Sequence, residues 1–163
     1  DTYFLNFNYT HTLQELYNIS PNRIHHIHGD INDPIMGHGE FDEINTTYKM
    51  NNDNFEIDDY VNELMVMLEN FYESSRKNTS LFLDEVSSFL LNRDVEIDFE
   101  EIHVLGHSLG EVDHVYFSAI AEWYPYATWT ITYHEDAEAM IKQLKKLGMS
   151  GARLITMEQY EKL

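Results

Sequence analysis

The amino-acid sequence predicts an α/β fold, namely a three-layer Rossmann-like domain with a mostly parallel sheet and an inserted helical hairpin. Two patterns support this prediction. Strand-like and helical segments alternate along the carboxyl-terminal part of the chain, as in parallel sheets whose strands are connected by crossover helices. In the middle, two stretches carry apolar residues at helical spacing. The 163 residues, 43% of them hydrophobic, can form one sizeable core, so we expect a single α/β domain over residues 1–163.

The amino-terminal elements are expected to be a strand, a short helix and a second strand. Residues 3–9 (YFLNFNY) are aromatic and mostly apolar, as in a buried strand. Leucines at helical spacing predict a helix over 10–17. After a turn at Pro21, residues 23–28 (RIHHIH) alternate polar and apolar side chains, which predicts a strand that ends at Gly29.

The middle of the chain is predicted to be an acidic loop over 40–56 followed by a helical hairpin over 57–92, both inserted into the domain. Acidic and asparagine residues dominate the loop, which is typical of a solvated segment. The two helices of the hairpin, over 57–72 and 81–91, each carry an apolar stripe that belongs to the core or to an interface. The first stripe contains Ile57, Tyr60, Val61, Leu64, Met67, Leu68 and Phe71.

The carboxyl-terminal part is expected to follow the order strand, helix, strand, helix, strand. Asp113 stands at the expected N-cap of the first of these helices, where a carboxylate accepts hydrogen bonds from exposed N–H groups. Gly148 follows two lysines that close the second helix, as expected for a C′ residue. The expected strands cover 102–105, 127–133 and 153–156, and the expected helices cover 113–123 and 137–147, with a last short helix near Glu158.

A net charge of −19, from 29 acidic and 10 basic residues, restricts the classes of partner. Nucleic acids and anionic membranes require a dense cationic face, so neither is expected as a partner. A nucleotide, another small molecule or a protein is expected instead. The absence of cysteine excludes disulfides, a thiol nucleophile and cysteine zinc sites. Because no apolar run approaches the ~18 residues of a membrane span, we expect a cytoplasmic protein.

Polar residues and glycines follow three of the expected strands. Asn8 and Thr10 follow the first, His28 and Gly29 end the second, and residues 106–110 (GHSLG) follow a third. Ligands of open parallel sheets bind at the carboxyl ends of the strands, so these residues mark one candidate site if the sheet is ordered as expected. Asn8 and His28 are its candidate functional residues.

The stretch GHSLG also matches the G-x-S-x-G motif of α/β-hydrolases, in which the serine is a nucleophile on a strained turn. Under this hypothesis Ser108 would attack the substrate. Such enzymes place an aspartate and then a histidine after the serine. Here no histidine follows Asp136, and Asp113, which His114 and His134 follow, is too close to Ser108 and better suited to cap a helix. The structural alternative is a glycine-rich turn in which Ser108 and Asp113 only bond to the backbone.

Nine histidines raise the question of a metal site. On a strand, His26 and His28 would share a face, and Asp30 or His38 could complete a set of ligands. No strong ligand spacing such as H-E-x-x-H is present, so no metal is expected.

Three segments together resemble the bacteriophage abortive-infection AbiH family. They are FLNFNYTHTLQELY over 4–17, HGDIND with IMGHG within 27–39, and IHVLGHSLGEVDHVYF over 102–117. The resemblance implies an anti-phage protein. Members of this family normally begin with an upstream strand and a Gly-Asn-Gly-Phe-Asp loop that this sequence lacks, so we expect the chain to be the carboxyl-terminal part of a longer protein.

More distantly, the same order of motifs is similar to sirtuin-like NAD-binding domains. This similarity implies that Asn8 contacts the nicotinamide ribose and that His28 is the general base. Thr10 departs from the aspartate usual at its position, and the loop that holds the pyrophosphate is absent. Without a cysteine zinc module, hydrolysis of NAD itself is the implied activity. The residues implied to contact this nucleotide are Thr10, Gly29, Gly106, His107, Ser108 and Asp113.

A second hypothesis is a non-catalytic sensor or protein-interaction module of a phage-defence protein, which would bind a phage or host protein. It is motivated by the missing glycine loop and by Thr10. The hairpin over 57–92 would then provide an interface, including one for a homo-oligomer. For Asn8 the structural alternative is a turn residue that bonds its own backbone.

Overall fold

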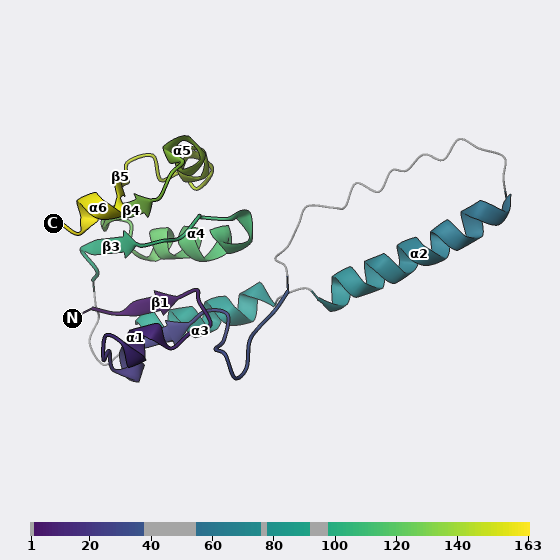
Figure 1. Ribbon diagram of the computed structural model, residues 1–163, viewed down its shortest axis with the longest axis horizontal. Helices are drawn as coiled ribbons and strands as arrows, with labels where there is room; N and C mark the ends of the chain where they lie inside the picture. The colour runs from purple at the N-terminus through teal and green to yellow at the C-terminus, as the bar shows by residue number, and fades with distance from the viewer. Residues whose placement is uncertain (1, 38–54, 76–77, 92–97) are drawn as a thin grey trace. The chain divides into compact units, whose positions relative to one another are not determined.

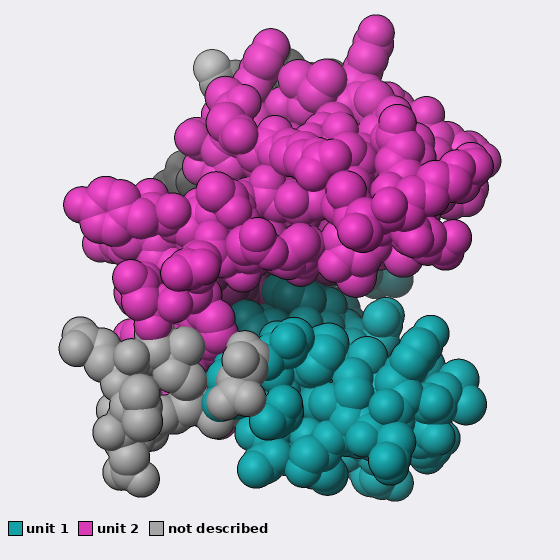
Figure 2. Space-filling model, turned by 90° about the vertical axis from the view of Figure 1, so that its left-hand side faces the viewer, with its two compact units in different colours: residues 1–78 teal, residues 79–163 magenta. Residues whose placement is uncertain are grey.

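The computed structural model describes residues 2–37, 55–75, 78–91 and 98–163. They form two compact units, residues 1–78 and residues 79–163, which Figure 2 shows in teal and magenta. The fold is mixed α/β with two small sheets, and all the paired strands within the described residues run parallel. The three-layer Rossmann-like arrangement and the single domain stay predictions.

Unit 1 contains a two-stranded parallel sheet. Strand β1 (Phe4–Asn6) pairs with β2 (Ile24–His26), so that Phe4 lies opposite Ile24 and Asn6 opposite His26. Helix α1 (Thr12–Glu15) and the 3₁₀ turn η1 (Pro21–Arg23) connect them (Figure 1). Both strands are shorter than predicted.

The early end of β1 has a local cause. The side-chain oxygen Oδ1 of Asn6 accepts a hydrogen bond from the backbone N–H of Asn8 at 3.0 Å, so the chain turns at residue 7 although Phe7 and Tyr9 are aromatic. Asparagine side chains compete with strand pairing in this way because they reach backbone groups two residues away.

The turn after β2 requires glycine at position 29. Gly29 has φ +70°, and a Cβ there would lie 2.2 Å from the backbone oxygen of Asp33. The turn is closed by a hydrogen bond of 2.8 Å from the Ile35 N–H to the His28 carbonyl. Glycine is therefore needed for the turn itself, independently of any ligand.

Helices α2 (Phe55–Ser74) and α3 (Thr79–Leu91) confirm the two helices predicted in the middle of the chain. They fall in different units, α2 in unit 1 and α3 in unit 2. Their packing as a hairpin stays a prediction. The predicted acidic loop over 40–56 lies outside the described residues up to the start of α2.

Unit 2 contains a three-stranded parallel sheet in the order β3-β4-β5. The helix between each pair of strands confirms the predicted strand–helix alternation (Figure 1). The elements are β3 (Glu101–Val104), η2 (Glu111–Asp113), α4 (His114–Trp123), β4 (Thr128–Tyr133), α5 (Ala137–Lys146), β5 (Arg153–Thr156) and α6 (Met157–Tyr160).

The core of unit 2 is apolar and forms around the central strand β4. Ile131 and Thr132 on this strand are buried, and helix α4 buries Tyr116, Phe117 and Ile120. Helix α3 contacts α4 and has its own buried stripe. That stripe contains Phe82, Val86 and Leu90. None of the helices within the described ranges combines the length and hydrophobicity that crossing a bilayer requires.

The helix ends of unit 2 confirm one predicted signal and correct another. Gly148 follows α5 with φ +70°, as expected for a C′ glycine. Asp113 occupies the N-cap position of α4, but its side chain makes no capping hydrogen bond and pairs instead with His107. Asp136 is the aspartate whose side chain caps a helix in unit 2, since its Oδ1 accepts from the Ala139 N–H at 2.9 Å.

The role of Gly29 can be tested with Gly29→Ala. A positive φ alone costs an alanine about 1–2 kcal/mol, and the contact with Asp33 adds to that cost because backbone atoms must move. We expect the free energy of unfolding to fall by more than this, and the Ile35 amide to lose protection in hydrogen exchange, because its acceptor is the His28 carbonyl next to the substitution.

Gly106→Ala is the matched control for that variant. Gly106 also has a positive φ, +65°, but its Cβ position is open. It should lose only about 1–2 kcal/mol. Equal losses for the two variants would show that the contact with Asp33 does not determine the need for glycine.

Candidate functional site

The carboxyl edge of the β1–β2 sheet carries a group of hydrogen-bonded polar side chains, which we call the strand-edge cluster. Its members come from β1 and the turn after it, from α1, from β2 and from the turn after β2. All lie in unit 1. They are Asn6, Asn8, His11, Gln14, His26 and Asp30.

Asn6 is the buried anchor of the strand-edge cluster. Its Oδ1 accepts from the Asn8 N–H at 3.0 Å, and its Nδ2 donates to the Thr10 carbonyl at 3.2 Å. A buried amide is costly unless it is hydrogen-bonded, so these bonds fix the path of residues 7–10. The predicted site residues Asn8 and Thr10 are exposed on this loop.

His26 links this loop to α1. Its Nδ1 lies 3.1 Å from the Asn8 carbonyl, and its Nε2 lies 2.9 Å from the side-chain nitrogen of Gln14. The neutral tautomer protonated on Nδ1 satisfies these two contacts, because Nδ1 then donates to Asn8 and Nε2 accepts from Gln14. The side-chain nitrogen of Asn6, 3.4 Å from Nδ1, is itself a donor and is not bonded to the ring in this tautomer. Both ring nitrogens of His26 are therefore used in holding the fold.

His11 and Asp30 form an imidazole–carboxylate pair at the exposed side of the strand-edge cluster. Nε2 of His11 lies 3.0 Å from Oδ2 of Asp30. The other oxygen of Asp30 accepts from the N–H groups of Asn32 at 2.8 Å and Asp33 at 3.2 Å. The bond from Asn32, followed by that from His11, lowers the pKa of Asp30 below its ordinary value, so this carboxylate is charged at neutral pH.

His28 lies deeper than its predicted role as an accessible base implies. The residue is buried, with 8% of its surface exposed, and its ring makes an edge contact of 5.8 Å with Phe7. Its carbonyl closes the turn at Gly29. Gly29 is therefore required by the turn. His28 and Asn8 lie in the same unit, but Asn8 is exposed and His28 is buried.

The corresponding edge of unit 2 begins with an open bend at Gly106. Gly106 is exposed, and its N–H donates to the hydroxyl of buried Thr132 on β4 at 3.0 Å. That hydroxyl donates in turn to the Val104 carbonyl at 3.3 Å. A backbone bend that is tied to the neighbouring strand and open to solvent is suited to contact a ligand.

His107 uses both ring nitrogens to hold this bend. Its Nδ1 accepts from the Leu109 N–H at 2.9 Å, and its Nε2 lies 3.3 Å from Oδ2 of Asp113. The ring packs at 5.0 Å on Phe117, and only 15% and 13% of the two paired side chains are exposed. His107 and Asp113 thus support the turn, and the aspartate does so instead of capping α4.

Ser108 lies on the surface of the same turn. In the hydrolase motif the backbone strain falls on the serine, whereas here the positive φ of 52° belongs to Leu109, whose side chain is fully buried. His114 contacts the Leu109 carbonyl at 3.0 Å. Within the described part of the chain no histidine bonds to Ser108, so the geometry does not favour the serine-hydrolase hypothesis.

The predicted site residues are divided between the two units. Asn8, Thr10, His28 and Gly29 lie in unit 1, and those of residues 106–113 lie in unit 2. The expectation that they share one site stays a prediction. No group of three or more histidine or acidic side chains within the described ranges could hold a metal ion, and His38 lies outside those ranges.

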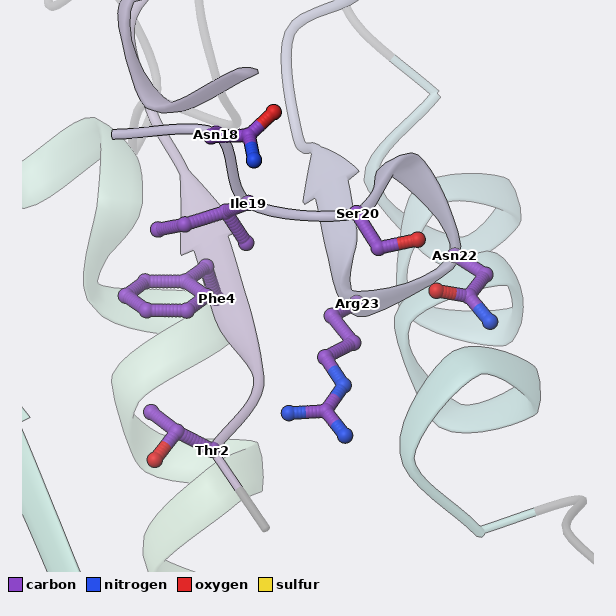
Figure 3. Close-up of a pocket in the computed structure, with 7 residues that line it drawn as sticks. All are labelled: Thr2, Phe4, Asn18, Ile19, Ser20, Asn22 and Arg23. Atoms are coloured by element: carbon purple, nitrogen blue, oxygen red, sulfur yellow. The ribbon is translucent and has the colours of Figure 1, made fainter. Parts of the chain in front are cut away.

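Two hollows occur at the opposite, amino ends of the strands. One of about 590 Å³ lies beside β1 and η1 in unit 1, where Figure 3 shows the ring of Phe4 beside Ile19 and the side chain of Arg23 below η1. The other, of about 800 Å³, lies in unit 2 beside Glu101, Thr128 and Arg153. Neither contains a predicted site residue.

Sequence reasoning missed the pairing of His11 with Asp30 and the anchoring role of Asn6. The signal for Asn6 was an asparagine inside an otherwise apolar strand (YFLNFNY). The pairing joins residues 19 positions apart in turns whose shape depends on Asn6 and Gly29. No local pattern in the sequence indicates it.

Comparison with known proteins places the chain in a family. No curated protein and no solved structure matches it. The model of one family, described as bacteriophage abortive infection AbiH, matches residues 1–133. The match includes all of unit 1 and continues through β4 of unit 2. Because it covers well over half of the 163 residues, the chain belongs to the bacteriophage abortive infection AbiH family.

Proposed function

We propose that this protein acts in abortive infection by hydrolysing NAD, and that the strand-edge cluster is part of its nucleotide site. The observation that supports this proposal is the cluster itself, in which an exposed amide, an imidazole and a charged carboxylate lie at the carboxyl edge of a parallel sheet. That edge is where ligands of such sheets bind.

The chemistry of these groups suits cleavage of the nicotinamide–ribose bond. The sugar becomes cationic, like an oxocarbenium ion, as this bond breaks, and a nearby carboxylate such as Asp30 stabilises positive charge. An imidazole with an ordinary pKa of about 6.5 can accept a proton near neutral pH. The exposed amide of Asn8 can orient a ribose hydroxyl or a water molecule by hydrogen bonding.

The proposed roles follow the resemblance to sirtuin-like domains. Asn8 positions the ribose, with Thr10 and Gly29 beside it, and the resemblance implies that His28 is the base. The resemblance also implies nucleotide contacts for the backbone at Gly106 and for the side chains of its turn. The residues that the resemblance implies for this contact in unit 2 are Gly106, His107, Ser108 and Asp113. Gly106 and Ser108 are the exposed members, whereas His107 and Asp113 pair with each other and support the turn.

Nicotinamide release tests this function directly. The full-length protein is incubated with NAD, alone and with lysate from phage-infected cells, and free nicotinamide is quantified. We expect release by the unmodified protein, and a decrease in kcat/KM of about 10²–10⁴-fold for Asn8→Ala, the range for losing a positioning group. A decrease of the same size is expected for His28→Ala if His28 is the base that the resemblance implies.

His25→Ala is the matched control for that experiment. His25 lies on β2, where side chains alternate between the two faces of the sheet, so it does not share the face of His26. Its removal should leave the rate within about threefold of the unmodified protein. Absence of nicotinamide release by folded, unmodified protein under both conditions would refute NAD hydrolysis.

The second candidate function, a protein-interaction module, is favoured by the apolar face of α2. Five side chains on one stripe of this helix, spaced as in a coiled-coil seam, are exposed by between 43% and 71%. The helix has 20 residues and is therefore about 30 Å long. We propose that this face pairs with α2 of a second copy of the chain. The stripe contains Tyr60, Leu64, Met67, Leu68 and Phe71.

Salt dependence distinguishes a second copy from a basic partner. α2 carries Glu63 beside the stripe, Glu69 and Glu73 on its opposite face, and no basic residue, so two copies repel each other. Salt screens this repulsion, with a Debye length of about 10 Å at 0.1 M. Self-association, measured by sedimentation, should therefore strengthen between about 0.05 M and about 0.5 M NaCl, whereas binding of a basic partner should weaken.

Two matched variants locate the interface. Leu64→Glu places a charge on the stripe and should weaken self-association by at least about tenfold, or about 1.4 kcal/mol. Val66→Glu makes the same change on the opposite face of α2, where Val66 is also exposed, and should have little effect. A monomer at every salt concentration would refute pairing of two copies.

A further inference from the structure

Two imidazole–carboxylate pairs in this protein differ in one respect that bears on chemistry. In the pair His107–Asp113, both nitrogens of the ring are engaged, one by the carboxylate and one by the Leu109 N–H. In the pair His11–Asp30, Nε2 is engaged by the carboxylate, and Nδ1 has no hydrogen bond to any residue that the structure describes. In the first pair both ring nitrogens are engaged by other groups, and in the second pair Nδ1 of His11 keeps a lone pair that can accept a proton.

The tautomer of His11 follows from its surroundings. Oδ1 of Asp30 is occupied by two backbone N–H groups, and Oδ2 lies 3.0 Å from Nε2 of His11. A charged carboxylate only accepts, so the proton of the neutral ring lies on Nε2 and the lone pair on Nδ1. The ring also stands edge-on to that of His26 at 5.5 Å, and His26 is itself fixed at both nitrogens.

His11 also has the exposure that a reacting base needs. Its side chain keeps 29% of its surface exposed and that of Asp30 keeps 34%, whereas His28 is buried. His26 has no unused nitrogen. Within the strand-edge cluster, His11 thus combines solvent access with a nitrogen that carries a free lone pair.

We propose that His11 is a general base of this protein and that Asp30 is its positioning residue. This inference rests on the proposed NAD hydrolysis and assigns its proton-accepting step to His11 instead of to buried His28. The geometry that supports it is the hydrogen bond of 3.0 Å between the two side chains, with Asp30 held by the backbone of its own turn.

The proposed step is balanced as follows. Nδ1 of His11 accepts a proton from a water molecule, and the water oxygen forms a bond to C1′ of the nicotinamide ribose. The bond between C1′ and the pyridinium nitrogen breaks, and its electron pair stays on that nitrogen, which neutralises the ring. The products are nicotinamide, ADP-ribose and a proton, first held by His11 beside Asp30 and then released to solvent.

Asp30→Asn is the decisive variant because it alters the tautomer with little change in shape. The new amide has one accepting oxygen, and the two backbone N–H groups of the turn favour its placement toward them. Its NH₂ group then faces Nε2 of His11 and donates to it, which moves the ring proton to Nδ1 and removes the lone pair from the reacting side.

Nicotinamide release by the full-length protein and histidine ¹⁵N spectra test the proposal together. We expect His11→Ala and Asp30→Asn each to lower kcat about a hundredfold with little change in KM, and added imidazole to restore part of the activity of His11→Ala but not of Asp30→Asn. His103→Ala is the matched control, since it removes an imidazole that pairs with Glu101 at 3.2 Å on β3.

The outcomes separate this proposal from the proposed function. Nicotinamide release that persists unchanged in His11→Ala would overturn the assignment of the base while NAD hydrolysis stands. Absence of release by the unmodified protein would overturn both. The spectra decide the geometry without activity, because His11 protonated on Nδ1 in the unmodified protein would overturn the proposal, and a change from Nε2 to Nδ1 protonation in Asp30→Asn would support it.

Discussion

The hydrogen bonds of one buried side chain, Asn6, determine the arrangement of the candidate site. An amide within an apolar strand must find partners, because an unsatisfied buried polar group costs about 1–3 kcal/mol. Asn6 finds them in the N–H of Asn8 and the carbonyl of Thr10. The chain therefore leaves the sheet after residue 6, which positions the Asn8 carbonyl for His26 and starts the turn that leads to His11.

The two units show how similar side chains acquire different roles. Each has a turn after a parallel strand, a glycine with positive φ and an imidazole paired with a carboxylate. In unit 2 the His107–Asp113 pair is mostly buried and saturated, and it stabilises a turn that strains Leu109. In unit 1 the corresponding pair is partly exposed and keeps one nitrogen available. Burial and the number of engaged nitrogens therefore distinguish a structural pair from one suited to proton transfer.

The acidic composition acts differently on the two proposed functions. A net charge of −19 helps to stabilise a cationic transition state near Asp30, but it also repels an anionic nucleotide that approaches the protein from solution. In unit 1 the basic side chain within the described ranges is that of Arg23, at the amino end of the sheet and away from the strand-edge cluster. On α2 the same acidic bias means that apolar contacts must outweigh repulsion if two copies pair.

Periodicity in the sequence by itself determined the α/β class, the helices α2 and α3, and the alternation of strands and helices in unit 2, because these depend on neighbours within a few residues. The motifs of residues 4–17, 27–39 and 102–117 also indicated the family relationship. Tertiary structure alone decided that Asp113 pairs with His107 instead of capping α4, that His28 is buried, and that His11 meets Asp30. Hydrogen bonds between separate turns depend on how the chain bends in three dimensions, and periodicity carries no information about that bending.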